Sequence, residues 1–248
     1  MTQNLYGRIA VFIDGPNFIA TRNENFPVPL SSISDIADRF FSPNIIKSTW
    51  YDSKPFFVEP DIIPISRSRY RAIRDQVKRE GPGALHNLKP EQEVHPDLFI
   101  SFLKSMKERA GFYWRQAERL AEAREYFDLV LTENSFVSFH EQCPRCKADI
   151  SIKTHAEKGE VDRKLSLDMI TGAYEDEYDY ALLIAGDRHY NDAIEIVQRL
   201  GKPVFVSFFC GSTSYDLIEK ADDFISFEEI RQQIESGRSR NLETALVV

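Results

Sequence analysis

Three aspartates in this sequence stand where their carboxylates can gather around one cation. Asp14 ends the apolar stretch RIAVFID, Asp187 ends the apolar stretch YDYALLIAGD, and Asp162 lies near the start of a predicted helix. In an open α/β sheet, ligands bind beyond the carboxyl ends of the strands, so we expect the three side chains to converge at one edge. Carboxylates placed so close repel one another unless a cation neutralises them, and oxygen ligands favour Mg²⁺ or Mn²⁺. Each aspartate taken alone is better explained as a helix N-cap, but the three together favour a metal site.

The segments that must position these aspartates alternate between strands and helices. Apolar runs typical of strands buried on both faces stand at 8–14, 178–187 and 202–209, and 45–53 is expected to be a further strand. Further short strands are expected at 127–133, 136–141 and 149–155, and helices at 32–41, 97–126 and 191–201. This order predicts an α/β fold with a mostly parallel sheet, helices on both faces, and a largely helical insertion.

The composition is that of a soluble globular protein, with 42% hydrophobic and 28% charged residues in 248. A net charge of -8 argues against a protein that coats nucleic acid by charge alone, but it is compatible with a metal-dependent enzyme that acts on nucleic acid. The sequence contains no apolar run of the roughly 20 residues that a bilayer requires. There is no recognisable signal peptide, and the three cysteines do not make a disulfide framework, so a cytoplasmic protein without a membrane is expected.

Four separated stretches resemble, in order, the successive blocks of the NYN domain, a branch of the PIN-like nucleases. They are VFIDGPN, EKGEVDRKLSLDMI, YDYALLIAGDRHYNDAIEIVQRLGKPVFV and KADDFISFEEI, and WYDS at 50–53 resembles the second strand of that family. The resemblance covers about 8–53 and 149–230. It predicts a single NYN/PIN-like domain at 1–236, interrupted by an insertion at about 54–128 and followed by a loose tail at 237–248.

The resemblance implies metal-dependent hydrolysis of phosphodiester bonds by metal-activated water, most often in single-stranded or structured RNA. It makes Asp14, Asp162 and Asp187 the metal-binding carboxylates and Asn17 the residue that orients the site. Asp168 also matches a family aspartate, but six residues on a helix turn it away from the face of Asp162, so it ranks below the others. The alternative is an RNA-binding or scaffold protein that has kept the fold with weakened catalysis. A phosphatase is disfavoured, because no D-x-D pattern follows Asp14.

One position departs from the family pattern. Members commonly read G-D-x-D after the fourth strand, whereas this chain reads Gly186-Asp187-Arg188-His189. Three consequences are open. His189 is itself a ligand, which would suit Mn²⁺ better than Mg²⁺, or Asp192 reaches the site from the following helix, or a second metal ion binds weakly.

The insertion contains the one dense basic stretch of this acidic chain. It includes Arg67, Arg69, Arg71, Arg74, Lys78 and Arg79, and Tyr70 lies among them. One interpretation is a path for the RNA backbone with Tyr70 stacking on a base, and the other is an ordinary solvated helix face. The insertion is also a candidate surface for a homo-oligomer contact or a regulatory protein.

A second metal site is a weaker hypothesis. The pattern of His140, Cys143, Cys146 and His155 has the C-x-x-C half of a structural zinc site, but its second half is two irregularly spaced histidines. The alternative is a tight turn that carries two thiols.

Overall fold

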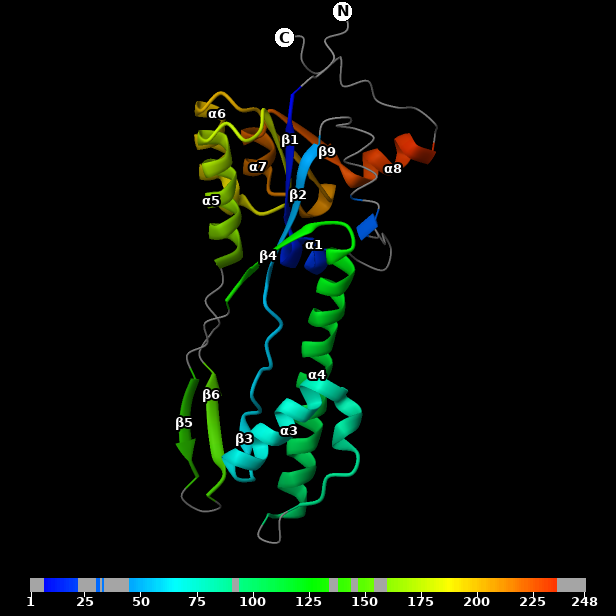
Figure 1. Cartoon of the computed structure of the whole chain (residues 1–248), viewed down its shortest axis with the longest axis vertical. Coiled ribbons are helices and arrows are strands. Elements are labelled where there is room, and N and C mark those ends of the chain that lie inside the picture. Colours follow the sequence, from blue (N-terminus) through cyan, green and yellow to red (C-terminus); the bar gives the residue numbers. More distant parts are fainter. Residues whose placement is uncertain are drawn as a thin grey trace, which may run out of the picture. The chain divides into compact units, whose positions relative to one another are not determined.

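The structure is a computed structural model that describes residues 7–21, 30, 31, 33, 45–90, 94–133, 138–143, 147–153 and 160–235 (Figure 1). It divides into two compact units. The first unit consists of residues 1–53, 122–132 and 159–248, and the second of residues 54–121 and 133–158. The helix expected at 32–41 and the tail at 237–248 lie outside the described residues, apart from Ile33. The prediction of one domain with an insertion at about 54–128 stays a prediction.

A parallel sheet of six strands forms the centre of the first unit. Its strands are β1 (Ile9–Asp14), β2 (Ile45–Ser53), β4 (Asp128–Thr132), β7 (Tyr180–Ile184), β8 (Val204–Phe208) and β9 (Asp223–Ser226). The strand order is β4-β2-β1-β7-β8-β9, and every neighbouring pair is parallel. Chain order runs outward in both directions from β1 and β7, so the topological switch point lies between these two strands, where α/β sheets bind ligands.

Helices cover both faces of this sheet, as the sequence predicts. The helices are α1 (Gly15–Thr21), α5 (Glu160–Tyr174), α6 (Asn191–Arg199), α7 (Tyr215–Lys220) and α8 (Phe227–Glu235), with the short 3-10 turns η2 (Arg188–Tyr190) and η3 (Cys210–Ser212) between them. In Figure 1, α5 and α6 stand on one side of β1 and β2, and α8 lies on the other.

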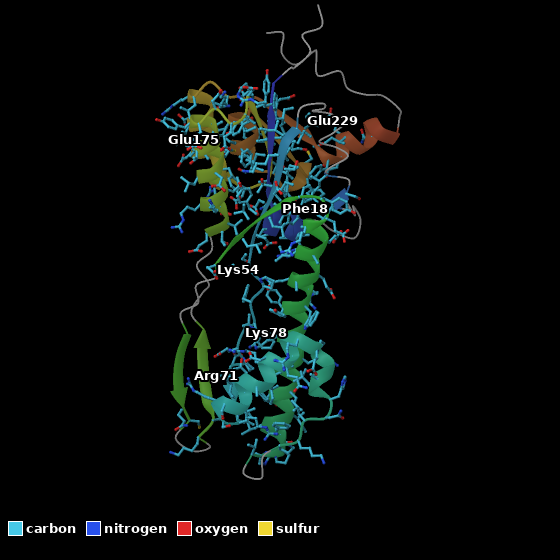
Figure 2. The ribbon with its side chains drawn as sticks, viewed as in Figure 1. Phe18, Lys54, Arg71, Lys78, Glu175 and Glu229 are labelled. Atoms are coloured by element: carbon cyan, nitrogen blue, oxygen red, sulfur yellow. The ribbon has the colours of Figure 1, made fainter. Side chains whose placement is uncertain are left out.

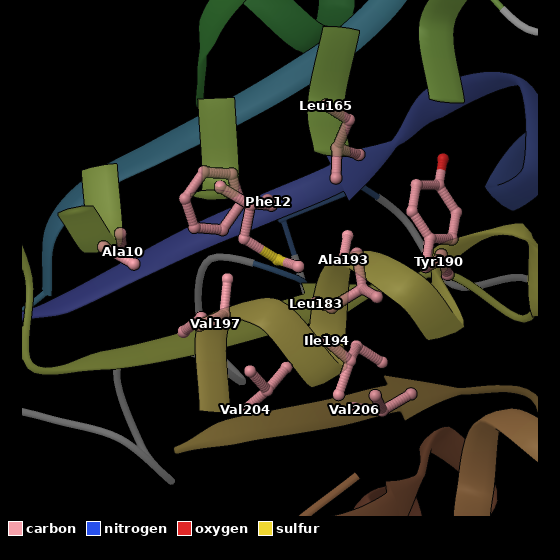
Figure 3. Packing of buried hydrophobic residues seen from close by; sticks show 14 of the residues in the cluster. Ala10, Phe12, Leu165, Leu183, Tyr190, Ala193, Ile194, Val197, Val204 and Val206 are labelled. Atoms are coloured by element: carbon pink, nitrogen blue, oxygen red, sulfur yellow. The ribbon is translucent and has the colours of Figure 1, made fainter. Parts of the chain in front are cut away.

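Alternation along β1 supplies one row of side chains to each apolar layer. Phe12 faces the layer formed by α5 and α6, where it packs with Leu165, Leu183 and Ile194 (Figure 3). On the opposite side, the ring of Phe18 meets the rings of Trp50, Phe209 and Phe227 at centroid distances of 5.7 to 5.9 Å (Figure 2 labels Phe18). Burying one such side chain contributes about 1.5–3 kcal/mol, so the two layers stabilise the sheet around the switch point.

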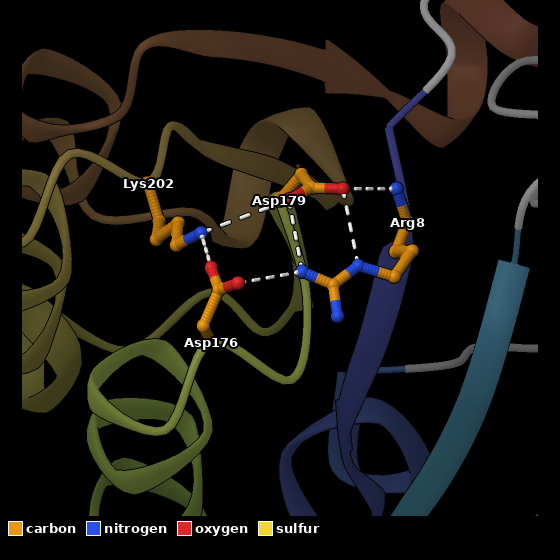
Figure 4. Close-up of polar contacts among 4 residues, drawn as sticks. All are labelled: Arg8, Asp176, Asp179 and Lys202. Carbon is orange, nitrogen blue, oxygen red and sulfur yellow. Dashed lines mark hydrogen bonds and ion pairs between the residues drawn. The ribbon is translucent and has the colours of Figure 1, made fainter.

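An ion-pair cluster ties together the amino ends of three adjacent strands (Figure 4). Arg8, just before β1, donates from its backbone N and from its guanidinium to the carboxylate of Asp179, just before β7. The same guanidinium reaches Asp176, and Lys202, ahead of β8, pairs with both aspartates. The contacts of Arg8 hold the pKa of Asp179 below its usual range. The cluster therefore fixes the sheet at the edge opposite to the carboxyl ends.

The second unit has its own small core. Its elements are β3 (Ile62–Ile63), α3 (Arg67–Glu80), the 3-10 turn η1 (Pro82–Leu85), most of α4 (Pro96–Arg124), β5 (Ser138–Gln142) and β6 (Asp149–Lys153). Apolar side chains of α3, η1 and α4 pack together, among them Ile73, Leu85, Phe102 and Met106. No helix of the described residues has the length and apolar character needed to cross a membrane.

The strands expected at 136–141 and 149–155 form, but they do not join the parallel sheet. They are β5 and β6, and they pair antiparallel in a separate sheet of order β3-β6-β5. The connection between β5 and β6 is too short for a parallel pair, which needs a crossover of a dozen or more residues, and so these two strands pair antiparallel with each other. Asp162 therefore lies in the first turn of α5, and it does not stand at the end of a strand of the parallel sheet.

Candidate metal centre

Asp14 is the last residue of β1, and its side chain is 3% exposed. Its Oδ1 accepts a hydrogen bond of 2.9 Å from the backbone N of Asn17, as an N-cap does at the start of α1. Gly15 permits this sharp exit from the sheet, because a Cβ at that position would lie 2.3 Å from Nε1 of Trp50. The capping interpretation and the site interpretation of Asp14 are thus compatible, since the cap uses one of its oxygens.

Asn17 joins the two loops at the switch point. Its Oδ1 accepts a hydrogen bond of 3.0 Å from the backbone N of Gly186, in the loop that follows β7. Gly186 is also close-packed, because an added Cβ would lie 2.5 Å from Cδ1 of Phe208 and 2.6 Å from the carbonyl oxygen of Ser212. The side chain of Asn17 therefore fixes the loop that carries Asp187, a positioning role consistent with the one that the family resemblance implies.

Asp162, Asp187 and His189 form the cluster best suited to a cation. Nδ1 of His189 lies 3.4 Å from Oδ2 of Asp162 and 3.2 Å from Oδ1 of Asp187, and that same Oδ1 accepts from the backbone N of His189. One potential ligand atom from each residue lies within 4.8 Å of the other two. Two carboxylates and an imidazole, all partly open to solvent, fit a divalent ion such as Mn²⁺.

Tyr190 was not among the site residues expected from the sequence. Its side chain is fully buried at the edge of the apolar layer in Figure 3, yet its hydroxyl donates a hydrogen bond of 2.7 Å to Oδ2 of Asp14. The same oxygen lies 3.4 Å from Oδ1 of Asp162. Tyr190 therefore links the carboxylate at the end of β1 to the group formed by Asp162, Asp187 and His189.

Burial makes the charge of Asp14 costly. Burial, which is the largest influence, and the nearby carboxylates of Asp162 and Asp187 together raise the pKa of Asp14 to about 6. The hydrogen bonds from Asn17 and Tyr190 oppose that rise. The pKa of Tyr190 is also raised, first by burial and then by Asp14 and Asp162, so its hydroxyl stays a donor. A cation beside these carboxylates would relieve their repulsion.

The two other aspartates named as candidates stand apart from this group. Asp168 accepts a hydrogen bond of 3.2 Å from the hydroxyl of Tyr51 and one of 2.6 Å from Nζ of Lys164, so its contacts are structural. Asp192 is exposed in the first turn of α6 and does not belong to the group of ligand atoms that the described residues form.

The basic stretch lies on α3, and its aromatic residue is not where the RNA hypothesis needs it. Tyr70 is 2% exposed and packs against Phe102 at a centroid distance of 6.4 Å, so the expectation that it stacks on a base is wrong. The reason is the apolar stripe that Tyr70 shares with Ile73 and Val77 at helical spacing. The basic side chains remain at the surface: Arg67, Arg71 and Arg79 are exposed, and Arg69, Arg74 and Lys78 are partly exposed.

The hypothesis of a structural zinc site concerns His140, Cys143, Cys146 and His155. Cys146 and His155 lie outside the described residues, as does the side chain of His140. Cys143 is partly buried, and its backbone N and O bond to Ala148 and Lys147 at 2.8 and 2.9 Å, which closes a tight loop. A zinc site at these four residues stays a prediction.

Comparison with known proteins gives one family and one solved structure. No curated protein matches the chain. A crystal structure of a protein of unknown function from Vibrio parahaemolyticus RIMD 2210633 is 16% identical, covers 93% of this chain and 98% of its own, and has a TM-score of 0.48.

The family model of the NYN domain matches residues 63–234, which is more than half of the chain. The match includes Asp162, Asp187 and His189, whereas Asp14 and Asn17 precede it. This chain belongs to the NYN domain family.

Proposed function

We propose that this chain is a metal-dependent nuclease that hydrolyses phosphodiester bonds, with RNA as the substrate. Nucleases are typical of the NYN family, and they act on nucleic acids. The observation that carries the proposal is the cluster in which ligand atoms of Asp162, Asp187 and His189 lie within 4.8 Å of one another. It stands at the carboxyl edge of the sheet, where an α/β fold binds its ligands.

Each residue has a separate task in this proposal. Asp162, Asp187 and His189 would hold the ion, with Asp14 as a further carboxylate beside them. A divalent ion bound there supplies Lewis acidity, which activates water and neutralises charge on the leaving oxygen. Asn17 holds the loop of Asp187 through Gly186, and Tyr190 holds the carboxylate of Asp14. Hydrolysis would form a bond from a water oxygen to phosphorus and break the bond from phosphorus to the leaving oxygen, with the water losing a proton to solvent and the leaving oxygen gaining one.

The exposure of the cluster fits a polymeric substrate. The side chains of Asp162 and Asp187 are 30% and 34% exposed, and that of His189 is 61% exposed. A phosphate group on a nucleic-acid strand can therefore approach the same atoms that would hold the ion. Asp14 is buried behind them and cannot meet the substrate in the same way.

The test is cleavage of a short, end-labelled, single-stranded RNA in Mn²⁺ or Mg²⁺. We expect the wild-type chain to cleave it and EDTA to stop cleavage. Asp187→Asn and Asp14→Asn should each lower the rate on the order of 100-fold or more, as losses of groups that stabilise developing charge do. Asp128→Asn is the matched control, since Asp128 is exposed at the amino end of β4. Undiminished cleavage in both site variants or in EDTA would overturn the proposal.

The second candidate is an RNA-binding or scaffold protein with weakened catalysis. It is favoured by His189, which stands where the family pattern has a carboxylate. The same assay separates the two candidates, because a scaffold protein would bind the RNA and leave it intact in either metal.

A further inference from the structure

Four basic residues of α3 lie on one face of the helix. Arg67, Arg71, Arg74 and Lys78 are spaced by four, three and four residues. At 3.6 residues per turn, these positions fall within about 60° of one another around the axis. Ser66 is the N-cap of the helix, and its side chain accepts a hydrogen bond from the backbone N of Arg69, so the first turn of the helix is well defined. We call these four residues the α3 stripe.

The α3 stripe flanks the face that anchors the helix. Tyr70, Ile73 and Val77 are buried and hold α3 on the core of the second unit. The stripe begins at the margin of that buried face, where Arg74 and Lys78 are partly exposed, and it continues to Arg67 and Arg71, which are exposed. Figure 2 labels Arg71 and Lys78 on this helix.

Positive charge in the α3 stripe is crowded and incompletely neutralised. The pKa of Lys78 is lowered by burial and by the guanidinium of Arg74, which is the effect expected of like charges held close. Arg74 pairs with Asp75 at 2.9 Å, and Nζ of Lys78 lies over the ring of Tyr113 at 5.5 Å. Arg71 is exposed, and within the described part of the chain no hydrogen bond or ion pair is found for it.

The charge of the chain is divided unequally between the two units. The second unit carries 17 Lys and Arg against 13 Asp and Glu, a formal charge of +4. The first unit carries 14 against 26, a formal charge of -12. A phosphate backbone is repelled by the unit that holds the candidate metal centre and attracted by the unit that holds the stripe.

We propose that the α3 stripe is the binding surface for the phosphate backbone of a single-stranded nucleic acid. This inference rests on the proposed function, because that function makes nucleic acid the substrate. It assigns affinity to the second unit and chemistry to the first. Arginine suits this role because its guanidinium can bond two phosphate oxygens at once and never loses its charge.

The α3 stripe differs from an ordinary solvated helix face because a single acidic residue, Asp75, lies three or four residues from any of its four basic residues. Such a face usually places an acidic residue one turn away from each basic one. The two acidic residues of α3 are Asp75, which pairs with Arg74, and Glu80, which accepts from the side chain of Gln76. Asp75 lies four residues after Arg71 and three before Lys78, but its carboxylate pairs with Arg74. No acidic residue lies one turn away from Arg67 or from Arg74.

The experiment measures binding without catalysis. Fluorescence anisotropy of labelled oligouridine, in EDTA and over a series of NaCl concentrations, gives the affinity and its salt slope. Four phosphate contacts predict a slope of roughly -2.8, at about -0.7 for each contact with a single strand. The double variant Arg67→Glu/Arg71→Glu should lower the affinity by about tenfold or more and reduce the slope by at least about 1.4.

Arg79→Glu is the matched control, because Arg79 lies on the same helix but about 80° or more around the axis from every member of the stripe. We expect it to leave the slope within about 0.7 of the wild type. An unchanged slope in the double variant, or an equal loss in the control, would overturn the inference. A variant pair of Arg67→Ala/Arg71→Ala, with thermal unfolding checked for all variants, should give about half the effect of the charge reversal.

Binding of DNA by the same variants tests whether the contacts are made to phosphates. An equal loss of affinity for oligothymidine DNA supports binding through phosphates, whereas a loss confined to RNA contradicts it. The role of the α3 stripe can be refuted while the proposed function stands. This is the result if the double variant binds RNA normally and Asp187→Asn still abolishes cleavage.

Discussion

The hydroxyl of Tyr190 donates a hydrogen bond of 2.7 Å to Oδ2 of Asp14, although the two residues are 176 positions apart in the chain. Both side chains are buried, and the hydroxyl has only one proton to give. The longer distance of 3.4 Å to Oδ1 of Asp162 leaves that proton with Asp14. A buried tyrosine thereby stabilises the ionised form of a buried aspartate beside a cluster of potential metal ligands.

Replacing Tyr190 by Phe should destabilise the protein in a way that depends on pH. The lost bond supports the ionised carboxylate of Asp14, so the pKa of Asp14 should rise above its present value of about 6. The cost should reach about 1.5–3 kcal/mol at pH 8, where Asp14 is ionised, and be smaller at pH 5. Urea unfolding in EDTA at the two pH values measures both numbers.

Tyr178→Phe provides the control for this comparison. The hydroxyl of Tyr178 is also buried, but it donates to the carbonyl oxygen of Met169, which does not titrate. Its loss should therefore cost the same at pH 5 and at pH 8. An equal pH dependence in the two variants would show that the hydroxyl of Tyr190 does not support the charge of Asp14.

Asp14→Asn should stabilise the metal-free protein at neutral pH. The pKa of Asp14 is raised in the folded state, from 3.8 to about 6, so the folded state binds more protons than the unfolded state between these values. Stability from this group therefore falls as pH rises through that window, by about 3 kcal/mol in all. The variant does not titrate, and its advantage over the wild type should grow from pH 4 to pH 7 and then level off. A constant difference across this range would contradict the raised pKa.

His189 should set the preference for the metal. Imidazole is a better ligand for Mn²⁺ than for Mg²⁺, so His189→Ala should weaken Mn²⁺ binding by roughly 10-fold or more and change Mg²⁺ binding less. His189→Asp should shift the preference toward Mg²⁺. Electron paramagnetic resonance of free Mn²⁺, with Mg²⁺ as competitor, measures both. His86→Ala is the control, since His86 is exposed in the second unit. Equal effects on both ions in His189→Ala would exclude the imidazole as a ligand.

The apolar strands and the three aspartates could be predicted from the sequence because they obey local rules. Strands buried on both faces read as continuous apolar runs, and β1 and β7 do so. The carboxyl ends of parallel strands share one edge of the sheet, which is why the sequence alone predicts that Asp14 and Asp187 lie together. The burial of Tyr70 also follows from a local pattern, because Tyr70 shares a helical spacing with Ile73 and Val77.

The remaining features depend on tertiary contacts that no local pattern encodes. The spacing of Tyr190, Ala193, Ile194 and Val197 predicts a buried ring, but it does not say which acceptor the hydroxyl meets across the sheet. Similarly, the sequence predicts β5 and β6 as strands, while the pairing of β6 with β3 follows from the separate packing of the second unit.

Asn17→Ala should loosen the loop that carries Asp187. The backbone N of Gly186 would lose its acceptor, and a donor left unpaired costs about 1–3 kcal/mol. Faster hydrogen exchange at the amide of Gly186, with the amides of β8 unchanged, is the expected result. Unchanged exchange at Gly186 would show that the side chain of Asn17 does not hold the loop.

The position of bound Mn²⁺ tests the central claim of this account most directly. Crystals grown with Mn²⁺ and measured at its absorption edge should show an anomalous peak within about 2 to 2.5 Å of oxygen atoms of Asp162 and Asp187, with His189 beside it. The peak should vanish in Asp162→Asn/Asp187→Asn crystals. A peak at another place, or one that survives in the double variant, would contradict the assignment of a metal centre at the carboxyl ends of β1 and β7.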